Sequence, residues 1–258
     1  MALTKTEGLV IKKTDFRETS LIVLFYTKDY GKLNLLFKGI KNSPDKFASN
    51  LEPFSYNEII FYKKKNTTLH LASQCDLKDN FSNLREDLDK VSSASSIIEL
   101  LDTVMPPEDP NRDAFNLALE SLKNMSNYPS ADKILTIFKI KLLDLVGFKP
   151  HLDSCIICQE KIITQARFSI SLGGLLCQNC FKNDLKARPI FRGTTATILH
   201  IERNSLEDNL RLGINPQIKK ELDYILESFL EFHLDKRLKT KKYMLEINQN
   251  IKILKNRR

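Results

Sequence analysis

The 258-residue sequence has no long apolar segment, because its longest uninterrupted apolar run is Leu21–Phe25. A membrane-spanning helix needs roughly 20 such residues, so we expect no membrane association. Charged residues at Lys5, Glu7, Lys12 and Lys13 interrupt the beginning of the chain and exclude the apolar core of a signal peptide. Five cysteines are too few for a disulfide scaffold. We therefore expect a cytoplasmic protein.

Catalytic motifs are also lacking. The only Gly-Lys pair, Gly31-Lys32, has neither the upstream glycine nor the Ser/Thr of a P-loop, and there is no His-Glu-x-x-His motif. The four histidines stand far apart in the sequence, without a shared pattern. A binding protein is therefore a better hypothesis than an enzyme.

What the sequence does have is an excess of positive charge, with a formal net charge of +8. The excess is uneven: residues 1–80, 155–193 and 194–258 each carry +4, whereas residues 81–154 carry −4. Such a charge balance favours an anionic partner, although it says nothing about the fold. An acidic middle thus separates two basic ends.

The first 80 residues are predicted to form strands. Segments rich in β-branched and aromatic residues are separated by turn signals such as Lys28-Asp29-Tyr30-Gly31, and they span residues 7–12, 19–27, 32–38, 56–62 and 67–74. Five short strands in this length fit a small closed barrel, for which the OB-fold is the leading interpretation and an SH3-like barrel the alternative.

After residue 80 the apolar period becomes helical. Helices are predicted from residue 81 to Pro106-Pro107, and over 113–125, 131–146, 194–204 and 217–238. Their apolar stripes are typical of a protein core. The pattern predicts an α+β multidomain chain in which helices follow the barrel.

Four of the five cysteines form the pattern C-x2-C-x18-C-x2-C, at Cys155, Cys158, Cys177 and Cys180. This spacing is typical of a zinc site, and four thiolates complete a tetrahedron without an open position. We therefore expect one structural Zn²⁺ in a ribbon. The alternatives are four reduced core thiols, two disulfides, a redox pair, or His151 as a substitute ligand. Cys75 is expected to be a buried bystander.

Basic side chains are the candidate DNA contacts, because neutralising phosphates supplies affinity. Phe16 and Phe37 could stack on bases. Phe37, however, occupies an alternating position in its strand, which favours a place in the core. The triplet Lys63-Lys64-Lys65 is more typical of a solvated hairpin tip. The candidates lie on the barrel, beside the ribbon and in the tail: Lys12, Lys13, Arg17, Lys38, Lys41, Lys46, Arg188, Arg192, Lys236, Arg237 and Lys239.

Taken together, several segments resemble the RecO family of bacterial recombination mediators and DNA repair proteins. The order of these segments and the cysteine pairs make the resemblance specific, and it covers nearly the whole chain. The segments are Glu7-Gly8-Leu9-Val10, Thr27-Lys28-Asp29-Tyr30-Gly31-Lys32, Lys38-Gly39, Leu51-Glu52-Pro53-Phe54, residues 143–150, the cysteine pairs with Phe168-Ser169 and Gly173-Gly174 between them, and His233 to Thr240.

The resemblance implies an N-terminal OB-fold barrel, a helical domain and an inserted zinc ribbon with four cysteine ligands. We place these at residues 1–80, at 81–154 with 194–245, and at 155–193, followed by a basic tail at 246–258. Many relatives lack some of the cysteines, so their full set supports metal in this member only.

The resemblance also implies a function. A RecO protein would bind single- and double-stranded DNA, anneal complementary strands and help to load RecA onto strands coated by single-stranded-DNA-binding protein (SSB). Its partners would be RecR, the C-terminal tail of SSB and, indirectly, RecA, and it would associate with the nucleoid. The alternatives are a zinc-ribbon enzyme acting on nucleic acid and a purely structural interaction protein.

Overall fold

A computed structural model describes residues 2–42, 51–65, 67–163, 165–234 and Thr240. They form two compact units: the first contains the described residues up to Leu135 with Thr240, and the second those from Thr136 to Leu234. The division falls within helix α5 (Ala131–Leu145). None of the helices in these ranges is long and apolar enough to span a membrane. The predicted domain boundaries at residues 80, 154, 193 and 245 stay predictions.

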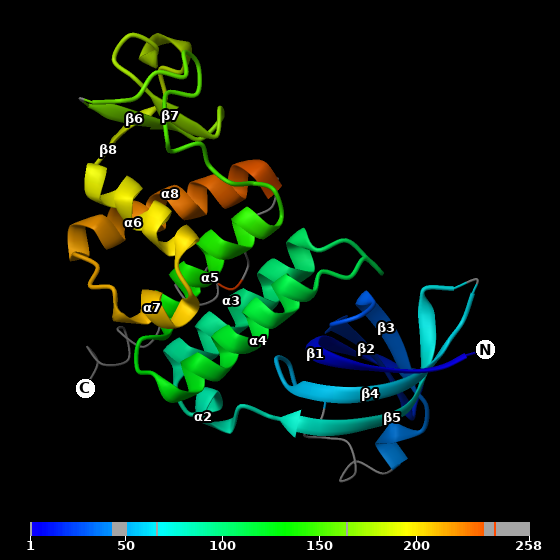
Figure 1. Ribbon diagram of the computed structural model, residues 1–258. Helices are drawn as coiled ribbons and strands as arrows, with labels where there is room; N and C mark the ends of the chain where they lie inside the picture. The colour runs from blue at the N-terminus through cyan, green and yellow to red at the C-terminus, as the bar shows by residue number, and fades with distance from the viewer. Residues whose placement is uncertain (1, 43–50, 66, 164, 235–239, 241–258) are drawn as a thin grey trace, which may run out of the picture. The chain divides into compact units, whose positions relative to one another are not determined.

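The N-terminal part of the first unit is a closed barrel of five strands (Figure 1). The strand order is β1-β2-β3-β5-β4, in which β3 and β5 pair in parallel and every other neighbouring pair is antiparallel. The strands are β1 (Ala2–Phe16), β2 (Ser20–Thr27), β3 (Gly31–Phe37), β4 (Tyr56–Lys63) and β5 (Leu69–Asp79).

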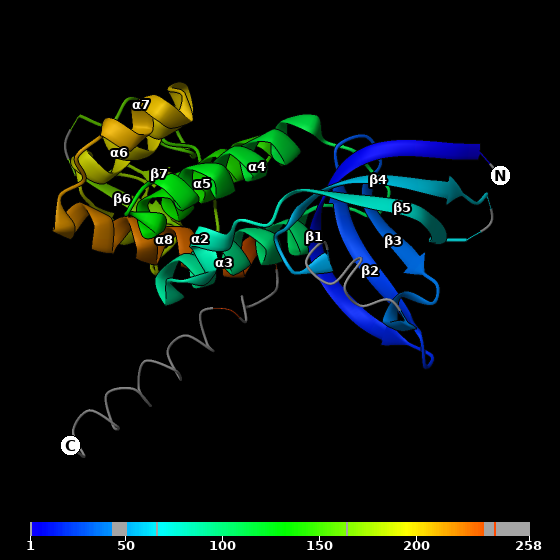
Figure 2. The same cartoon turned by 90° about the horizontal axis from the view of Figure 1, so that it is seen from below.

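Strand β1 is longer than the predicted 7–12 because it pairs with two different strands. Residues 2–9 lie opposite β4 and residues 8–16 opposite β2, with a bulge between Val10 and Lys12 (Figure 2). One strand therefore holds both sides of the barrel together.

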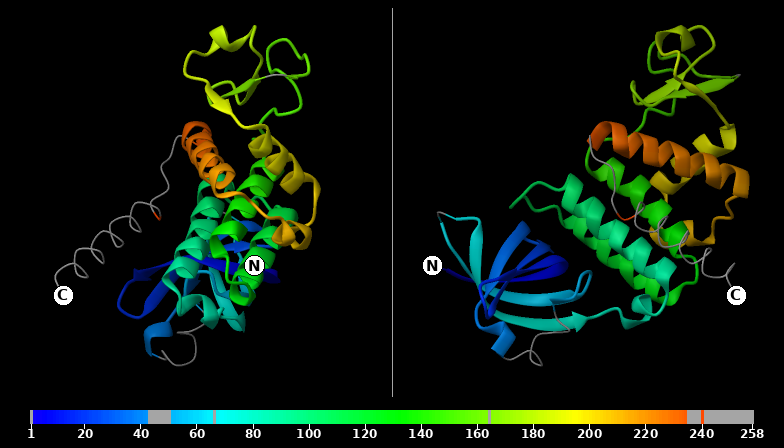
Figure 3. Two further views of the ribbon diagram at one scale, coloured as in Figure 1. Left: turned by 90° about the vertical axis from the view of Figure 1, so that its left-hand side faces the viewer. Right: turned by 180° about the vertical axis from the view of Figure 1, so that it is seen from behind.

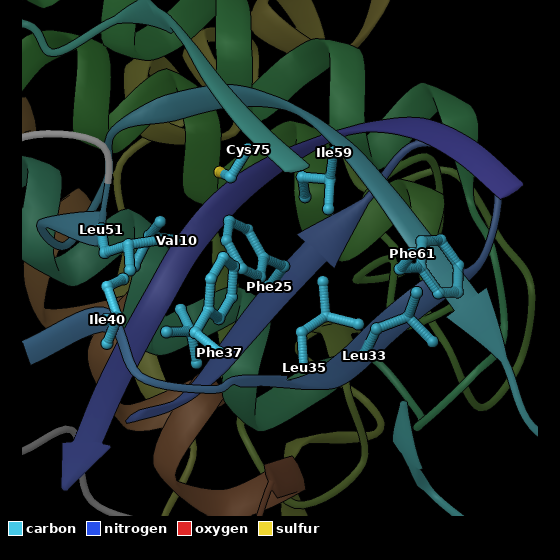
Figure 4. Close-up of a cluster of buried hydrophobic side chains, with 11 residues drawn as sticks. Val10, Phe25, Leu33, Leu35, Phe37, Ile40, Leu51, Ile59, Phe61 and Cys75 are labelled. Atoms are coloured by element: carbon cyan, nitrogen blue, oxygen red, sulfur yellow. The ribbon is translucent and has the colours of Figure 1, made fainter. Parts of the chain in front are cut away.

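The barrel interior follows the period of two in the sequence. In β3, Leu33, Leu35 and Phe37 are buried, whereas the alternate residues Lys32 and Asn34 are half-buried; Leu36, near the end of the strand, is buried as well. These side chains meet apolar residues of the other strands in one core (Figure 4). Phe37 is 5% exposed, so its core interpretation is confirmed, and stacking on bases is excluded for this ring.

Cys75 lies in the same core and is 2% exposed. Burial, together with the charge of Asp76, raises the pKa of this thiol to about 12. Cys75 is therefore a neutral packing residue, as expected, and takes no part in the cysteine cluster.

Helices complete the first unit. Helices α2 (Ser82–Arg85), α3 (Leu88–Val104) and α4 (Arg112–Asn127) follow β5, and α3 and α4 lie side by side (Figure 1). The predicted helix from residue 81 to Pro106 is interrupted at Asp87, whose side chain accepts hydrogen bonds from the backbone amides of Asp89 and Lys90 and so starts α3 anew.

Polar and aromatic contacts join the barrel to these helices. The Tyr26 hydroxyl donates to the carbonyl of Asn111 (3.2 Å), and its ring lies 6.2 Å from that of Phe115. The Lys32 ammonium donates to the Asp102 carbonyl (2.6 Å) and lies 3.3 Å from its carboxylate. The barrel and the first helices are thus in direct contact. The prediction of an α+β chain in which helices follow an N-terminal β domain is confirmed.

The second unit combines helices with a small antiparallel sheet of order β7-β6-β8. Helices α6 and α8 lie side by side (Figures 1 and 3), and the rings of Phe168 and Phe229 join the sheet to α8 at 6.1 Å. The elements are β6 (Ala166–Ser169), β7 (Gly174–Leu176), β8 (Arg188–Ile190), α6 (Arg192–Arg203), α7 (Leu206–Arg211) and α8 (Pro216–Leu234). Helix α7 was not predicted.

The barrel approaches the segment before α4 closely at one glycine. Two glycines with positive φ, one at this approach and one away from it, allow the approach to be tested by matched substitutions. At Gly31 (φ +64°), an added Cβ would lie 2.5 Å from the Asp109 amide nitrogen, whereas at Gly39 (φ +67°) it would meet nothing within 4 Å. We expect Gly31→Ala to lower the free energy of unfolding by about 2–5 kcal/mol, from backbone strain plus overlap, and Gly39→Ala by only about 1–2 kcal/mol. Urea unfolding measures both, and equal losses would contradict the close approach.

Candidate metal centre and nucleic-acid interface

The four cysteines Cys155, Cys158, Cys177 and Cys180 converge on one point. Their sulfur atoms all lie within 4.8 Å of one another, and the Cys158 and Cys177 sulfurs are 3.7 Å apart. In a tetrahedral site with Zn–S bonds of about 2.3 Å, ligand sulfurs are separated by about 3.8 Å. The cluster therefore has the size and donor set to hold a metal ion.

Local hydrogen bonds shape the turn at the first cysteine pair. The Gln159 amide donates to the Cys155 carbonyl and the Cys155 amide to the Glu160 carbonyl, both at 2.9 Å. Gln159 takes a left-handed conformation (φ 62°) that closes the turn. The chain therefore reverses directly after Cys158, and both side chains face the same point.

The second pair follows β7 without a connecting loop. The Cys180 amide donates to the Cys177 carbonyl (3.0 Å), and the Cys177 amide donates to the Cys155 sulfur (3.4 Å). The backbone around Leu175 binds the first turn, because it donates to His151 (2.9 Å) and accepts from Ile156 (2.8 Å). Backbone hydrogen bonds therefore hold the two cysteine pairs next to each other.

His151 has a different role from that of a substitute ligand. Its Nε2 lies 2.7 Å from the Ser154 hydroxyl, and the cluster of possible ligand atoms in the described residues contains only the four cysteines. Its backbone forms a bridge with Gly174. The residue supports the first turn through its backbone.

The electrostatics of the cluster call for a cation. Burial opposes ionisation of Cys155, but hydrogen bonds from the backbone amides of Cys158, Cys177 and Ile157 outweigh it and lower the pKa to about 6. At Cys180, burial and then hydrogen bonding to the neighbouring thiols raise the pKa to about 12. Four thiolates this close together would repel one another and would require a positive charge between them. All four cysteines are unbridged.

Five of the predicted DNA contacts are brought to one end of the barrel. The 3₁₀ turn η1 (Ile40–Asn42) follows β3, and its Lys41 amide donates to the Thr19 carbonyl in the β1–β2 turn (3.1 Å). This bond places the end of β3 beside the end of β1. The five exposed side chains gathered there are Lys12, Lys13, Arg17, Lys38 and Lys41.

Acidic neighbours divide these five side chains. Lys13 pairs with Glu52 (2.5 Å) and Lys41 with Asp15 (2.9 Å). Within the described ranges, no carboxylate forms an ion pair with the remaining three: Lys12, Arg17 and Lys38. These three have the charge that is most available to an anionic ligand.

An aromatic ring lies beside this basic group. The Arg17 guanidinium stands 5.3 Å from the centre of the Phe16 ring, which is half-buried. Phe16 therefore keeps the predicted access to a base, in contrast to Phe37.

The other predicted contacts are distributed differently. Arg188 in β8 and Arg192 at the start of α6 are exposed and belong to the second unit. Lys46, Lys236, Arg237 and Lys239 lie outside the described residues.

Family models and individual relatives both assign the chain to one protein family. The model for the recombination protein O N terminal matches residues 1–81, and the model for its C terminal matches residues 85–242. DNA repair protein RecO of Syntrophus aciditrophicus is 32% identical, over 96% of this chain and 97% of the relative. DNA repair protein RecO of Bacillus pumilus is 31% identical, over 98% and 97%. The resemblance inferred from the sequence motifs is confirmed.

The cysteine cluster predicts a metal-dependent second unit. Cys177→Ser replaces a charged ligand by a neutral hydroxyl, so we expect the purified variant to lose its metal and to unfold at a lower temperature. Elemental analysis and thermal unfolding measure the two effects. The control is Cys75→Ala, which should destabilise the barrel core but leave the metal content unchanged. Equal metal retention in both variants would contradict the site.

Proposed function

The chain belongs to the RecO family of DNA repair proteins, and from this premise we propose that it binds single- and double-stranded DNA and anneals complementary strands. With RecR it would help to load RecA onto single strands coated by SSB, whose C-terminal tail would be a further contact. Its role in DNA repair and recombination follows from the family, as does the conclusion that it is not an enzyme. A DNA-binding role would place it on the nucleoid.

The observation that carries the proposal is a basic group on the barrel, Lys12, Arg17 and Lys38, that forms no ion pair within the described residues; we call it the unpaired basic group. We interpret the barrel as an OB-fold, because five strands closed in the order 1-2-3-5-4 are typical of it. OB-folds bind oligonucleotides through the β2–β3 face and the connections β1–β2 and β4–β5. Arg17 lies in the first of these connections, and Lys38 follows β3 directly. Charge is thus available where this fold binds nucleic acid.

Annealing can be explained by such a surface without any catalytic group. Two phosphate backbones repel each other, and basic side chains that neutralise both lower the cost of bringing them together. No nucleophile, nucleotide or divalent ion is needed for this step. The proposed mechanism is therefore charge neutralisation on a rigid scaffold.

For the metal centre we propose one structural Zn²⁺, held by Cys155, Cys158, Cys177 and Cys180. Four thiolates in a tetrahedron are typical of structural zinc and leave no coordination position for a substrate. The ion would supply the positive charge that the four neighbouring thiols lack. We accordingly propose a zinc ribbon over residues 155–193, between the two parts of a helical domain at 81–154 and 194–245.

Annealing distinguishes this function from the alternative of a nucleic-acid enzyme. We expect the purified protein to anneal complementary oligonucleotides in the absence of nucleotide and Mg²⁺, faster than the oligonucleotides anneal alone. A gel-based time course measures the rate, and the same samples report cleavage. Cleaved strands, or a requirement for ATP, would contradict the proposal, as would a lack of DNA binding at low salt.

The unpaired basic group predicts a particular salt dependence. If Arg17 and Lys38 each neutralise one phosphate, their joint replacement by Ala should weaken single-strand binding and flatten the slope of log K against log salt by about 1.4. Fluorescence anisotropy at several salt concentrations measures this slope.

A charge-matched control is available on the same barrel. Lys5 and Lys78 both pair with Glu58, at 2.8 and 3.2 Å. Lys5→Ala/Lys78→Ala removes the same net charge, but it should leave the salt slope nearly unchanged. An equal flattening in both double variants would show that total charge matters and that the Arg17 and Lys38 positions do not.

A further inference from the structure

The second unit contains an apolar groove that the proposed function does not use. The groove has a volume of about 1100 Å³ and lies between α8 and the segment that leads from Asp184 to Phe191. Aromatic rings line it and remain accessible: Phe191 is 50% exposed, Tyr224 39% and Phe232 55%. Three large rings exposed along one groove are unusual for a surface without a ligand.

A second hollow continues the groove. It has a volume of about 660 Å³ and shares Pro189, Phe191 and Glu221 with the first, so the Phe191 ring stands where the two hollows meet. In each hollow a guanidinium lies over a ring: Arg188 over Tyr224 at 4.5 Å, and Arg167 over Phe181 at 4.9 Å. Both hollows therefore combine aromatic rings with cations, and we treat the two together as one track.

The charge of the track is positive. Five basic residues line the two hollows: Arg167, Lys186, Arg188, Arg192 and Lys220. In the described part of the chain only two carboxylates line them, and both accept hydrogen bonds from the protein. Asp184 binds the hydroxyls of Ser169 (2.6 Å) and Ser171 (3.0 Å), and Glu221 binds the Phe191 amide (3.0 Å). The basic residues therefore outnumber the carboxylates, and both carboxylates are engaged by the protein itself.

The backbone holds Phe191 in a fixed place. The residue precedes α6 in an extended conformation, and its amide is bound to Glu221, which also accepts from the Thr194 hydroxyl. Its ring is exposed although its backbone is anchored. Such an arrangement presents a flat surface without the entropic cost of ordering it on binding.

We propose that this track, lined by Phe191, Tyr224 and Phe232, binds single-stranded nucleic acid by stacking its bases. Lys186 and Lys220 would contact the phosphates. Aromatic rings interleaved with basic residues are typical of sequence-independent single-strand binding. A duplex keeps its bases stacked inside, so it would meet only the charges. The inference rests on the proposed DNA-binding function and adds a second site, which distinguishes single strands from duplex.

A fluorescent reporter tests the stacking directly, because the chain contains no tryptophan. In Phe191→Trp, the single indole should keep the stacking surface, and its emission should be quenched as oligo(dT) binds. Anisotropy of end-labelled oligo(dT) reports total binding in the same titration. The control is Tyr128→Trp, at a ring that is 48% exposed at the end of α4 in the first unit. It should bind equally well without quenching.

Removal of the rings tests the preference for single strands. We expect Phe191→Ala/Tyr224→Ala to weaken oligo(dT) binding about 10-fold or more, since each stacked base contributes roughly 1–3 kcal/mol, and to leave duplex binding nearly unchanged. Tyr224→Phe should retain the parental affinity. Metal content and thermal unfolding show whether the double variant has folded.

The outcomes separate this inference from the proposed function. Binding of oligo(dT) by Phe191→Trp without quenching would overturn the track while leaving DNA binding intact. Equal losses for single strands and duplex in the double variant would also overturn it. Quenching by an acidic peptide but not by oligo(dT) would assign the track to a protein partner and overturn it as well. No binding of any DNA by the parent protein would overturn both.

Discussion

The parallel pairing of β3 with β5 is the contact on which the first unit depends. It joins residues 34–36 to residues 69–71 and closes the sheet into a barrel. Two parallel neighbours cannot be joined by a tight hairpin, and the long connection between them contains β4 and the turn η1. The antiparallel pairing of β2 with β3, which sets Phe37 opposite Leu21, brings Lys38 and Lys41 beside the β1–β2 turn.

In the second unit, the part around the cysteine cluster has only a small core of its own. The strands beside it are only three or four residues long. The apolar side chains packed there are few, with Cys155, Leu176 and Ala187 at their centre. A metal ion held by four thiolates would supply the missing stability. The segment that bears Lys186, Arg188 and Phe191 follows Cys180 in the chain, so the groove would depend on the same ion.

The sequence predicted most of the strands and helices, because their patterns are local. The alternation in β3 and the cysteine spacing each depend on a few neighbouring residues. The parallel pairing at Asn34 joins distant segments and leaves no local pattern. Helix α7 could have been found, since Ser205 caps it by accepting from the Asp208 amide in a typical Ser-x-x-Asp start. The aromatic groove could not, because Tyr224 and Phe232 come from α8 and Phe191 from the connection between β8 and α6.

The two binding surfaces would respond differently to the product of annealing. The basic group on the barrel would act on phosphates, which single strands and duplex both present. The aromatic track would act on exposed bases, and these disappear when a strand pairs with its complement. Pairing would therefore remove the stacking contacts while the phosphate contacts persist, and affinity would fall as the duplex forms. A protein that binds its substrate more tightly than its product can release that product without nucleotide hydrolysis.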